Sequence, residues 1–164
     1  MIALSGCSGA RPIPSSFVNM LSNGFECGMS VTYDKTPYQI HFTKSDAISY
    51  QISVEKPADL KGFVFKCENS NVSITYNGLG INIDQASLPQ SAFAQAIFVV
   101  LDSAINSKKI TYKIFSNRIE MYGETAIGKY TINVDKKTLR PVSISVPAVN
   151  LNILITDFKL INKS

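Results

Sequence analysis

The chain has 164 residues, of which 45% are apolar and 17% are charged. This length predicts a single domain with room for a hydrophobic core, and the composition is that of an ordinary globular chain. No apolar run reaches the ~18 residues that a membrane-spanning helix needs. The net charge of +4 is scattered, without an Arg-rich stripe or a stacking-aromatic motif, so we expect no nucleic-acid partner.

The N-terminal tetrapeptide Leu4-Ser5-Gly6-Cys7 resembles the bacterial lipobox, Leu-(Ala/Ser)-(Gly/Ala)-Cys. We therefore expect residues 1–12 to be a lipoprotein signal remnant and linker. A diacylglycerol on the Cys7 sulfur would anchor residues 13–164, the single domain, to the outer face of the cell membrane. Such signals normally have a charged start and an apolar run of ~7–15 residues. The six residues before Cys7 carry no charge, so if Met1 is the true start, Cys7 is an ordinary exposed thiol.

Two kinds of periodicity divide the rest of the chain. Residues 14–21 predict a short helix, and alternation of apolar and polar residues then predicts half-buried strands. The dipeptide Asn77-Gly78 is the strongest hairpin signal, because both residues tolerate the positive φ angles of a type I′ turn. The expected strands before the long apolar segment are residues 25–33, 38–43, 47–54, 63–67, 72–76 and 80–84.

Residues 88–107 form the one long segment in which the period lengthens to that of a helix. Phe93, Ile97, Val100 or Leu101, and Ala104 or Ile105 recur at three- and four-residue steps. Ser87 or Ser91 could cap this helix. A helix this apolar is expected to be covered on most of its circumference, pressed into the hollow of a curved antiparallel sheet.

Alternation resumes after the helix. We expect strands at residues 110–115, 118–124, 128–134, 141–146 and 151–161, which brings the total to about eleven. In the last strand the alternation slips, because Leu151, Ile153 and Ile155 are in phase while Phe158 and Leu160 are not. A bulge near Thr156-Asp157 would restore the phase.

Three local motifs resemble the LolA/LolB-like family of lipoprotein carriers. They are the Pro-x-x-Leu-x-Gly link at residues 57–62, the hairpin at residues 74–79, and the Asp-x-x-Thr-x-x-Pro turn at residues 135–141. The order of six strands, a helix and five strands also fits. The resemblance implies a mostly β (α+β) fold, an incomplete antiparallel β-barrel wrapped around a central apolar helix. The chain resembles the Gram-positive, clostridial branch, which includes a spore-germination lipoprotein that partners a cell-wall amidase.

Signals of catalysis are few, so the chain is not expected to be an enzyme and no cofactor is expected. His41 is the single histidine, on the polar side of its strand, and no nucleophile, P-loop or metal-ligand motif occurs. The sequence leaves open whether Asp84 forms a carboxylate pair with Glu120 or Glu124. Cys27 and Cys67 lie on the apolar phase of strands that are not expected to be neighbours, which favours two free thiols over a disulfide.

Two functions follow. In the first, the domain is a membrane-anchored, non-catalytic adaptor for a protein partner in the cell envelope, such as a peptidoglycan-processing enzyme; the resemblance to the clostridial branch favours it. In the alternative, the domain is a carrier or sensor that holds a lipid or lipidated peptide in its apolar concave face. The residues expected to line that face are Met29, Val31, Phe63, Phe65, Phe93, Ile97, Val100 and Leu101. These residues could equally fill the core.

Overall fold

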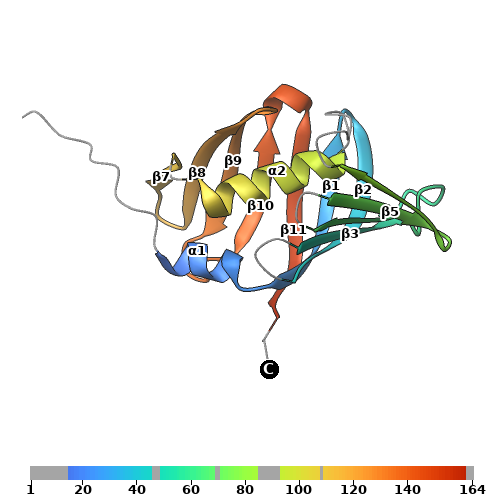
Figure 1. Cartoon of the computed structure of the whole chain (residues 1–164). Helices are drawn as coiled ribbons and strands as arrows, with labels where there is room; N and C mark the ends of the chain where they lie inside the picture. Colours follow the sequence, from blue (N-terminus) through green and yellow to red (C-terminus); the bar gives the residue numbers. More distant parts are fainter. Residues whose placement is uncertain (1–14, 46–48, 69–70, 85–92, 108, 162–164) are drawn as a thin grey trace, which may run out of the picture.

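A computed structural model of the protein describes residues 15–45, 49–68, 71–84, 93–107 and 109–161. Within these residues the chain forms two α-helices and an eleven-stranded sheet (Figure 1). The elements are α1 (Ser15–Ser22), β1 (Phe25–Tyr33), β2 (Thr36–Lys44), β3 (Ser49–Lys56), β4 (Val64–Glu68), β5 (Asn71–Tyr76), β6 (Leu79–Asp84), α2 (Phe93–Asn106), β7 (Thr111–Ile114), β8 (Arg118–Thr125), β9 (Gly128–Asp135), β10 (Pro141–Val146), the 3-10 turn η2 (Pro147–Val149) and β11 (Leu151–Leu160).

The sheet is a meander broken once, at the helix. Its strand order is β6-β5-β4-β3-β2-β1-β11-β10-β9-β8-β7, and every neighbouring pair is antiparallel. The first strand therefore pairs with the last in the middle of the sheet, while β6 and β7 form its two edges. The sheet is open rather than closed, which confirms the expected incomplete antiparallel barrel.

Helix α2 runs along the hollow of the sheet and connects its two edges (Figure 1). Its buried side chains lie around much of the helix: Phe93, Ala94, Ala96, Ile97, Phe98, Val100, Leu101 and Ala104. Asp102, the acidic residue of this helix, is exposed. The prediction of a covered apolar helix is confirmed for residues 93–106, while the expected cap at Ser87 or Ser91 lies outside the described residues. Helix α1 packs against α2.

The two turns that the sequence singled out form as expected. Asn77 and Gly78 have φ angles of +49° and +81°, as a type I′ turn requires. In the turn after β9, one carboxylate oxygen of Asp135 accepts hydrogen bonds from the backbone N–H of Lys137 and Thr138 and from the Thr138 hydroxyl. These bonds, those from Thr138 first, hold the pKa of Asp135 below its usual range. They explain why Asp and Thr stand three residues apart in this motif.

The expected bulge in the last strand is present. The pairing of β1 with β11 shifts between Glu26, opposite Lys159, and Gly28, opposite Thr156. Two residues of β11 thus oppose Cys27 alone, and Asp157 adopts a left-handed φ of +50°. The bulge returns Phe158 to the core, where it is 7% exposed, so the slip of phase in the sequence marked a real change of geometry.

Candidate functional site

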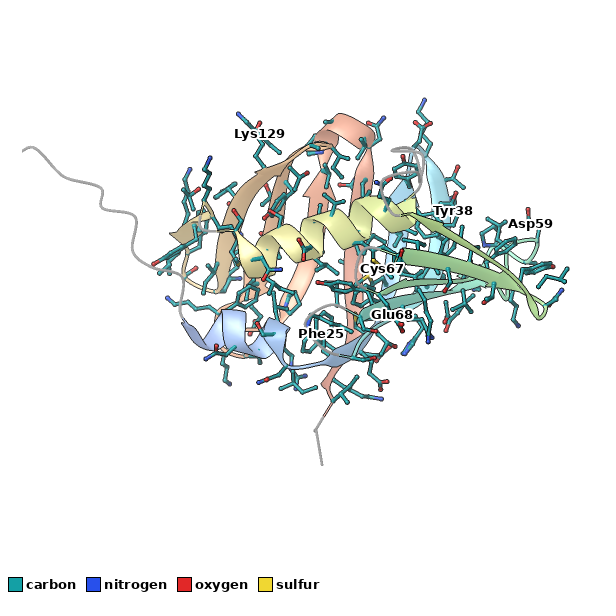
Figure 2. All side chains as sticks on the ribbon, in the orientation of Figure 1. Phe25, Tyr38, Asp59, Cys67, Glu68 and Lys129 are labelled. Carbon is teal, nitrogen blue, oxygen red and sulfur yellow. The ribbon has the colours of Figure 1, made fainter. Side chains whose placement is uncertain are left out.

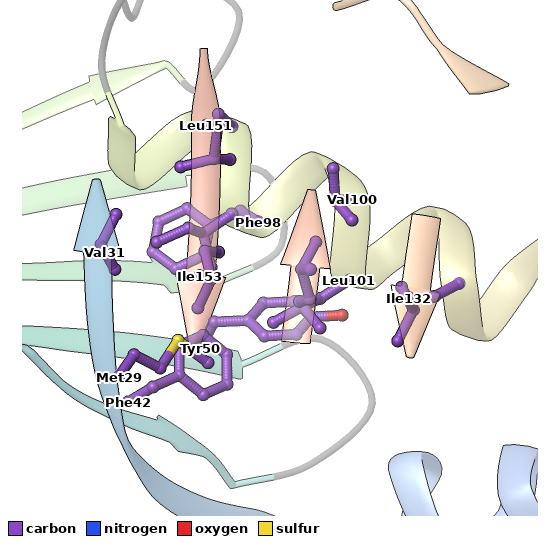
Figure 3. Close-up of a cluster of buried hydrophobic side chains, with 14 of the residues drawn as sticks. Met29, Val31, Phe42, Tyr50, Phe98, Val100, Leu101, Ile132, Leu151 and Ile153 are labelled. Carbon is purple, nitrogen blue, oxygen red and sulfur yellow. The ribbon is translucent and has the colours of Figure 1, made fainter. Parts of the chain in front are cut away.

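The eight residues expected to line an apolar binding face lie in or against the core. Met29, Val31, Phe93, Ile97, Val100 and Leu101 are each 8% exposed or less. Phe63 and Phe65 are half-buried and pack against this core. Figure 3 shows Val100 and Leu101 of α2 facing the labelled side chains of the sheet. Water hardly reaches the first six side chains, which pack in the core. Binding of a ligand by the eight residues stays a prediction.

Phe63 and Phe65, the half-buried members of this set, belong to a row of aromatic rings. Phe93 stacks on Tyr38 with 4.5 Å between ring centroids and meets the edge of Phe65 at 5.7 Å. Phe63 lies 6.5 Å from Phe65 and stacks on Tyr76 at 4.3 Å. The row therefore leads from the start of α2 to the β4–β5–β6 hairpins. There the rings emerge, because Tyr76 is 37% exposed and neighbouring Leu79 is 79% exposed.

The two cysteines of the sheet are free and buried, as expected. Strands β2 and β3 separate Cys27 on β1 from Cys67 on β4. Burial, with a smaller contribution from the carboxylate of Glu26, raises the pKa of the Cys27 thiol to about 12. A thiol this hard to ionise is a poor nucleophile.

The titratable residues form no recognisable catalytic arrangement in the described part of the chain. The Nε2 atom of His41 lies 3.8 Å from Glu26 Oε2, and both side chains are about two-fifths exposed. Glu120 accepts hydrogen bonds from Tyr122 and Arg118, which lower its pKa in that order. The strand that carries Asp84 and the strand that carries Glu120 and Glu124 lie near opposite edges of the sheet. No group of three potential metal ligands occurs among the described residues.

The outer face of the central strands carries uncharged polar side chains that bond to one another. Across neighbouring strands, hydrogen bonds join Ser30 to Gln39, Asn133 to Ser143 and Ser145 to Asn152. Leu154 of β11 stands among them, 55% exposed and directly opposite Ser30 on one side and Ser143 on the other. We call this surface, formed by Ser30, Gln39, Asn133, Ser143, Ser145, Asn152 and Leu154, the outer face.

A second surface feature escaped the sequence analysis. A pocket of about 400 Å³ lies where β7 meets β8 and is lined by Ser107, Lys109, Thr111, Tyr122, Gly123, Glu124 and Lys129. None of the eight predicted lining residues belongs to it. The available signal was the cluster of Lys108 and Lys109 after the helix, which the sequence explains equally well as a helix end.

Two expectations concern the anchor. Cys7 and the rest of residues 1–12 lie outside the described residues, so lipidation stays a prediction. Neither α1 nor α2 has the length and apolarity to cross a membrane.

Comparison with known proteins shows likeness in fold alone. No protein-family model matches the chain, and no curated protein matches its sequence. The chain is similar to the crystal structure of an uncharacterized conserved protein from Thermus thermophilus, with a TM-score of 0.60 and 9% identity over 92% of this chain and 88% of that chain.

Two further solved structures carry informative descriptions. One is a LolA superfamily protein from Nitrosomonas europaea, with a TM-score of 0.45 and 9% identity over 92% of this chain and 94% of that chain. The other is the CwlD amidase from Clostridioides difficile in complex with the GerS lipoprotein, with a TM-score of 0.48 and 15% identity over 80% of this chain and 82% of that chain. The solved structures thus include the LolA-like group that the sequence resembles. At these identities and TM-scores the likeness does not extend to ligand or partner.

Proposed function

We propose that this chain is a non-catalytic adaptor of the cell envelope, tethered to the membrane through a lipid on Cys7 and presenting its outer face to a protein partner. The observation that carries the proposal is the filled hollow of the sheet. Because Ile97 and Val100 have no exposed surface and Leu101 is 2% exposed, the helix takes the space that a carried acyl chain would need. Recognition is then left to the outside of the molecule.

The outer face has the composition of an interface centre. Its residues are uncharged, so a partner can cover them without stripping water from an unpaired charge. Their mutual hydrogen bonds hold them in place before binding, which lowers the entropic cost of association. The exposed Leu154 supplies the apolar contact at the centre of this surface.

A peptidoglycan-processing enzyme is the partner class that the sequence resemblance implies. The proposal therefore predicts that affinity capture from the native cell retrieves such an enzyme with the wild-type chain. Leu154→Arg should abolish the capture, because it puts a charge at the centre of the interface. Ile114→Arg is the matched control, since Ile114 is 50% exposed but lies on edge strand β7.

The same capture tests the alternatives. Retrieval of lipid without protein would contradict the adaptor and support a carrier. Equal loss of partner in the two arginine variants would contradict the assignment of the outer face. Incorporation of labelled fatty acid into the wild-type chain but not into Cys7→Ala, expressed with the full upstream region of the gene, tests the anchor. Equal labelling of the wild-type chain and Cys7→Ala would contradict a lipid anchor on Cys7.

The aromatic row favours a carrier or sensor as the second candidate. Phe63 and Tyr76 form an apolar surface that reaches solvent at the β4–β5–β6 hairpins, and an acyl chain could lie along it. Binding of a fluorescent fatty acid that is lost in Phe63→Ser, with the fold retained, would support this function. Absence of binding to the wild-type chain would exclude it.

A further inference from the structure

Strands β7 and β8 are of unequal length, and the mismatch leaves a notch in the sheet edge. Thr111, the first residue of β7, lies opposite Tyr122, whereas β8 continues to Thr125. The pocket of about 400 Å³ sits at this step, within the usual size range of ligand pockets, ~300–1,000 Å³. We call the residues that line it, Ser107, Lys109, Thr111, Tyr122, Gly123, Glu124 and Lys129, the notch.

The register of the strands directs backbone groups of β8 into the notch. The N–H of Phe115 donates to the carbonyl of Arg118, so this pair is of the hydrogen-bonded kind. Such pairs alternate along an antiparallel ladder. Arg118, Glu120, Tyr122 and, next in phase, Glu124 therefore direct their N–H and C=O groups toward the β7 side. Strand β7 begins too late to pair with Glu124, so the backbone groups of Glu124 face the pocket.

The notch is also positively charged. Lys109 and Lys129 contribute two ammonium groups and Glu124 contributes one carboxylate. Glu124 and Lys129 lie directly opposite each other on β8 and β9, yet no ion pair joins them in the described part of the chain. Lys129 extends from the end of its strand into solvent (Figure 2). Both ammonium groups are therefore available to an anionic ligand.

Gly123 and Tyr122, which line the notch, are held in place by contacts with neighbouring side chains. Gly123 leaves room for the Tyr130 ring, whose hydroxyl forms a 3.0 Å hydrogen bond with Ser103 Oγ on α2. The Tyr122 ring is held by its hydrogen bond to Glu120 and by the ammonium group of Lys113, 5.6 Å from the ring centroid. A ligand would thus meet a site that is formed before it binds.

We propose that the notch binds the free carboxylate end of an extended peptide. The last residues of the peptide add a short strand to β8, exchanging backbone hydrogen bonds with Glu124. Lys109 and Lys129 bind the terminal carboxylate, and the Tyr122 ring contacts the peptide side chains. The peptide takes the place that β7 would occupy if that strand began two residues earlier.

The test uses the whole chain, ¹⁵N-labelled, titrated with acetyl-trialanine that ends either in a free acid or in an amide. The acid peptide should shift the backbone resonances of Glu124 and its neighbours in the notch. The amide should bind at least about tenfold more weakly, because it lacks the charge that strengthens hydrogen bonds to the lysines. No partner enzyme is present, so the result is independent of the proposed adaptor role.

Single substitutions locate the site. Lys109→Gln and Lys129→Gln should each weaken binding of the acid peptide several-fold. Lys61→Gln, the same change of charge on an exposed residue between β3 and β4, should leave the affinity unchanged. Lack of binding, equal affinity for acid and amide, shifts confined to other strands, or equal weakening by Lys61→Gln would each overturn the proposal.

A second arm identifies the source of the carboxylate. A folded carrier protein extended by the same three alanines is titrated in place of the peptide. Binding of both supports a site for the C-terminus of a protein, while binding of the tripeptide alone supports a site for small peptides.

Discussion

At the scale of single residues, Gly123 carries a packing constraint that its neighbours impose. A Cβ atom at this position would lie 2.3 Å from both Cζ and the hydroxyl oxygen of Tyr130, far inside contact distance. Tyr130 is 2% exposed and its hydroxyl is hydrogen-bonded to Ser103, so its ring has little room to move.

Gly123→Ala should therefore destabilise the protein by about 1–3 kcal/mol through overpacking, measured as the change in the urea unfolding midpoint. Gly80→Ala is the control and should cost less, because the nearest atom to its added Cβ is a Thr75 methyl carbon at 3.1 Å, a contact that a shift of a few tenths of an ångström relieves. Equal stability of Gly123→Ala and the parent would show that Tyr130 can move aside.

Cys27 makes a second prediction at this scale, in the alkaline range. Its folded-state pKa, about 12, lies above the reference value of 9.0, so the folded state holds the thiol proton more tightly than the unfolded state. The resulting stability is complete below pH 9 and is lost as the pH rises toward 12. Cys27→Ala should flatten this part of the curve of unfolding free energy against pH. An unchanged slope in the variant would assign the alkaline loss to other groups.

At the scale of elements, Lys44 ties α1 to the sheet. Its side chain is fully buried at the end of β2, and its ammonium group donates to the carbonyl of Ser22, the last residue of α1, at 3.2 Å. A cation at the C-terminal end of a helix also complements the helix dipole.

Lys44→Met keeps the length of the side chain and removes the donor. We expect a loss of ~1–3 kcal/mol and faster hydrogen exchange at the α1 amides of Leu21 and Ser22. Lys66→Met is the matched control, because the Lys66 side chain is 52% exposed on β4. Unchanged protection of α1 in Lys44→Met would mean that apolar packing alone holds the helix.

The elements themselves were largely predictable. Each strand buries one side, so apolar and polar residues alternate along its sequence. The failures have physical reasons. Residues 110–115 alternate as a strand, but pairing stops at Thr111, where the chain turns toward α2. The notch lies where β7 begins one residue later than predicted, and a difference this small is below the precision of pattern reading. Burial of Lys44 was also missed. Lys44 follows Ile40 and Phe42 on the buried phase of β2, but a lysine at the end of a strand is usually exposed.

At the scale of the whole molecule, the candidate binding face could not be separated from the core by sequence. A residue such as Ile97 has the same apolar phase whether it faces an empty hollow or a packed sheet. Only the three-dimensional distance between α2 and the strands decides between them. The outer face was likewise hidden, because Ser30, Ser143 and Leu154 come together only through the pairing of β1 with β11 and of β11 with β10.

The pairing of the first and last strands predicts a gradient of local stability. Strands β1 and β11 have neighbours on both sides and bury Val31 and Leu151, while β6 and β7 each have one neighbour. Native-state hydrogen exchange should therefore be slowest at inward-facing residues of the central pair and fastest along the edges. Equal protection from centre to edge would indicate that the sheet opens only by global unfolding.

The same pairing sets the order of events during synthesis. Of the eleven strands, β1 is made first, whereas β11, one of its two partners, is made last. Until then the edge of β1 that will pair with β11 stays exposed, even if the hairpins made earlier have already formed. The sheet is therefore completed only after β11 has been made, and until then the edge of β1 must be kept from pairing with another chain.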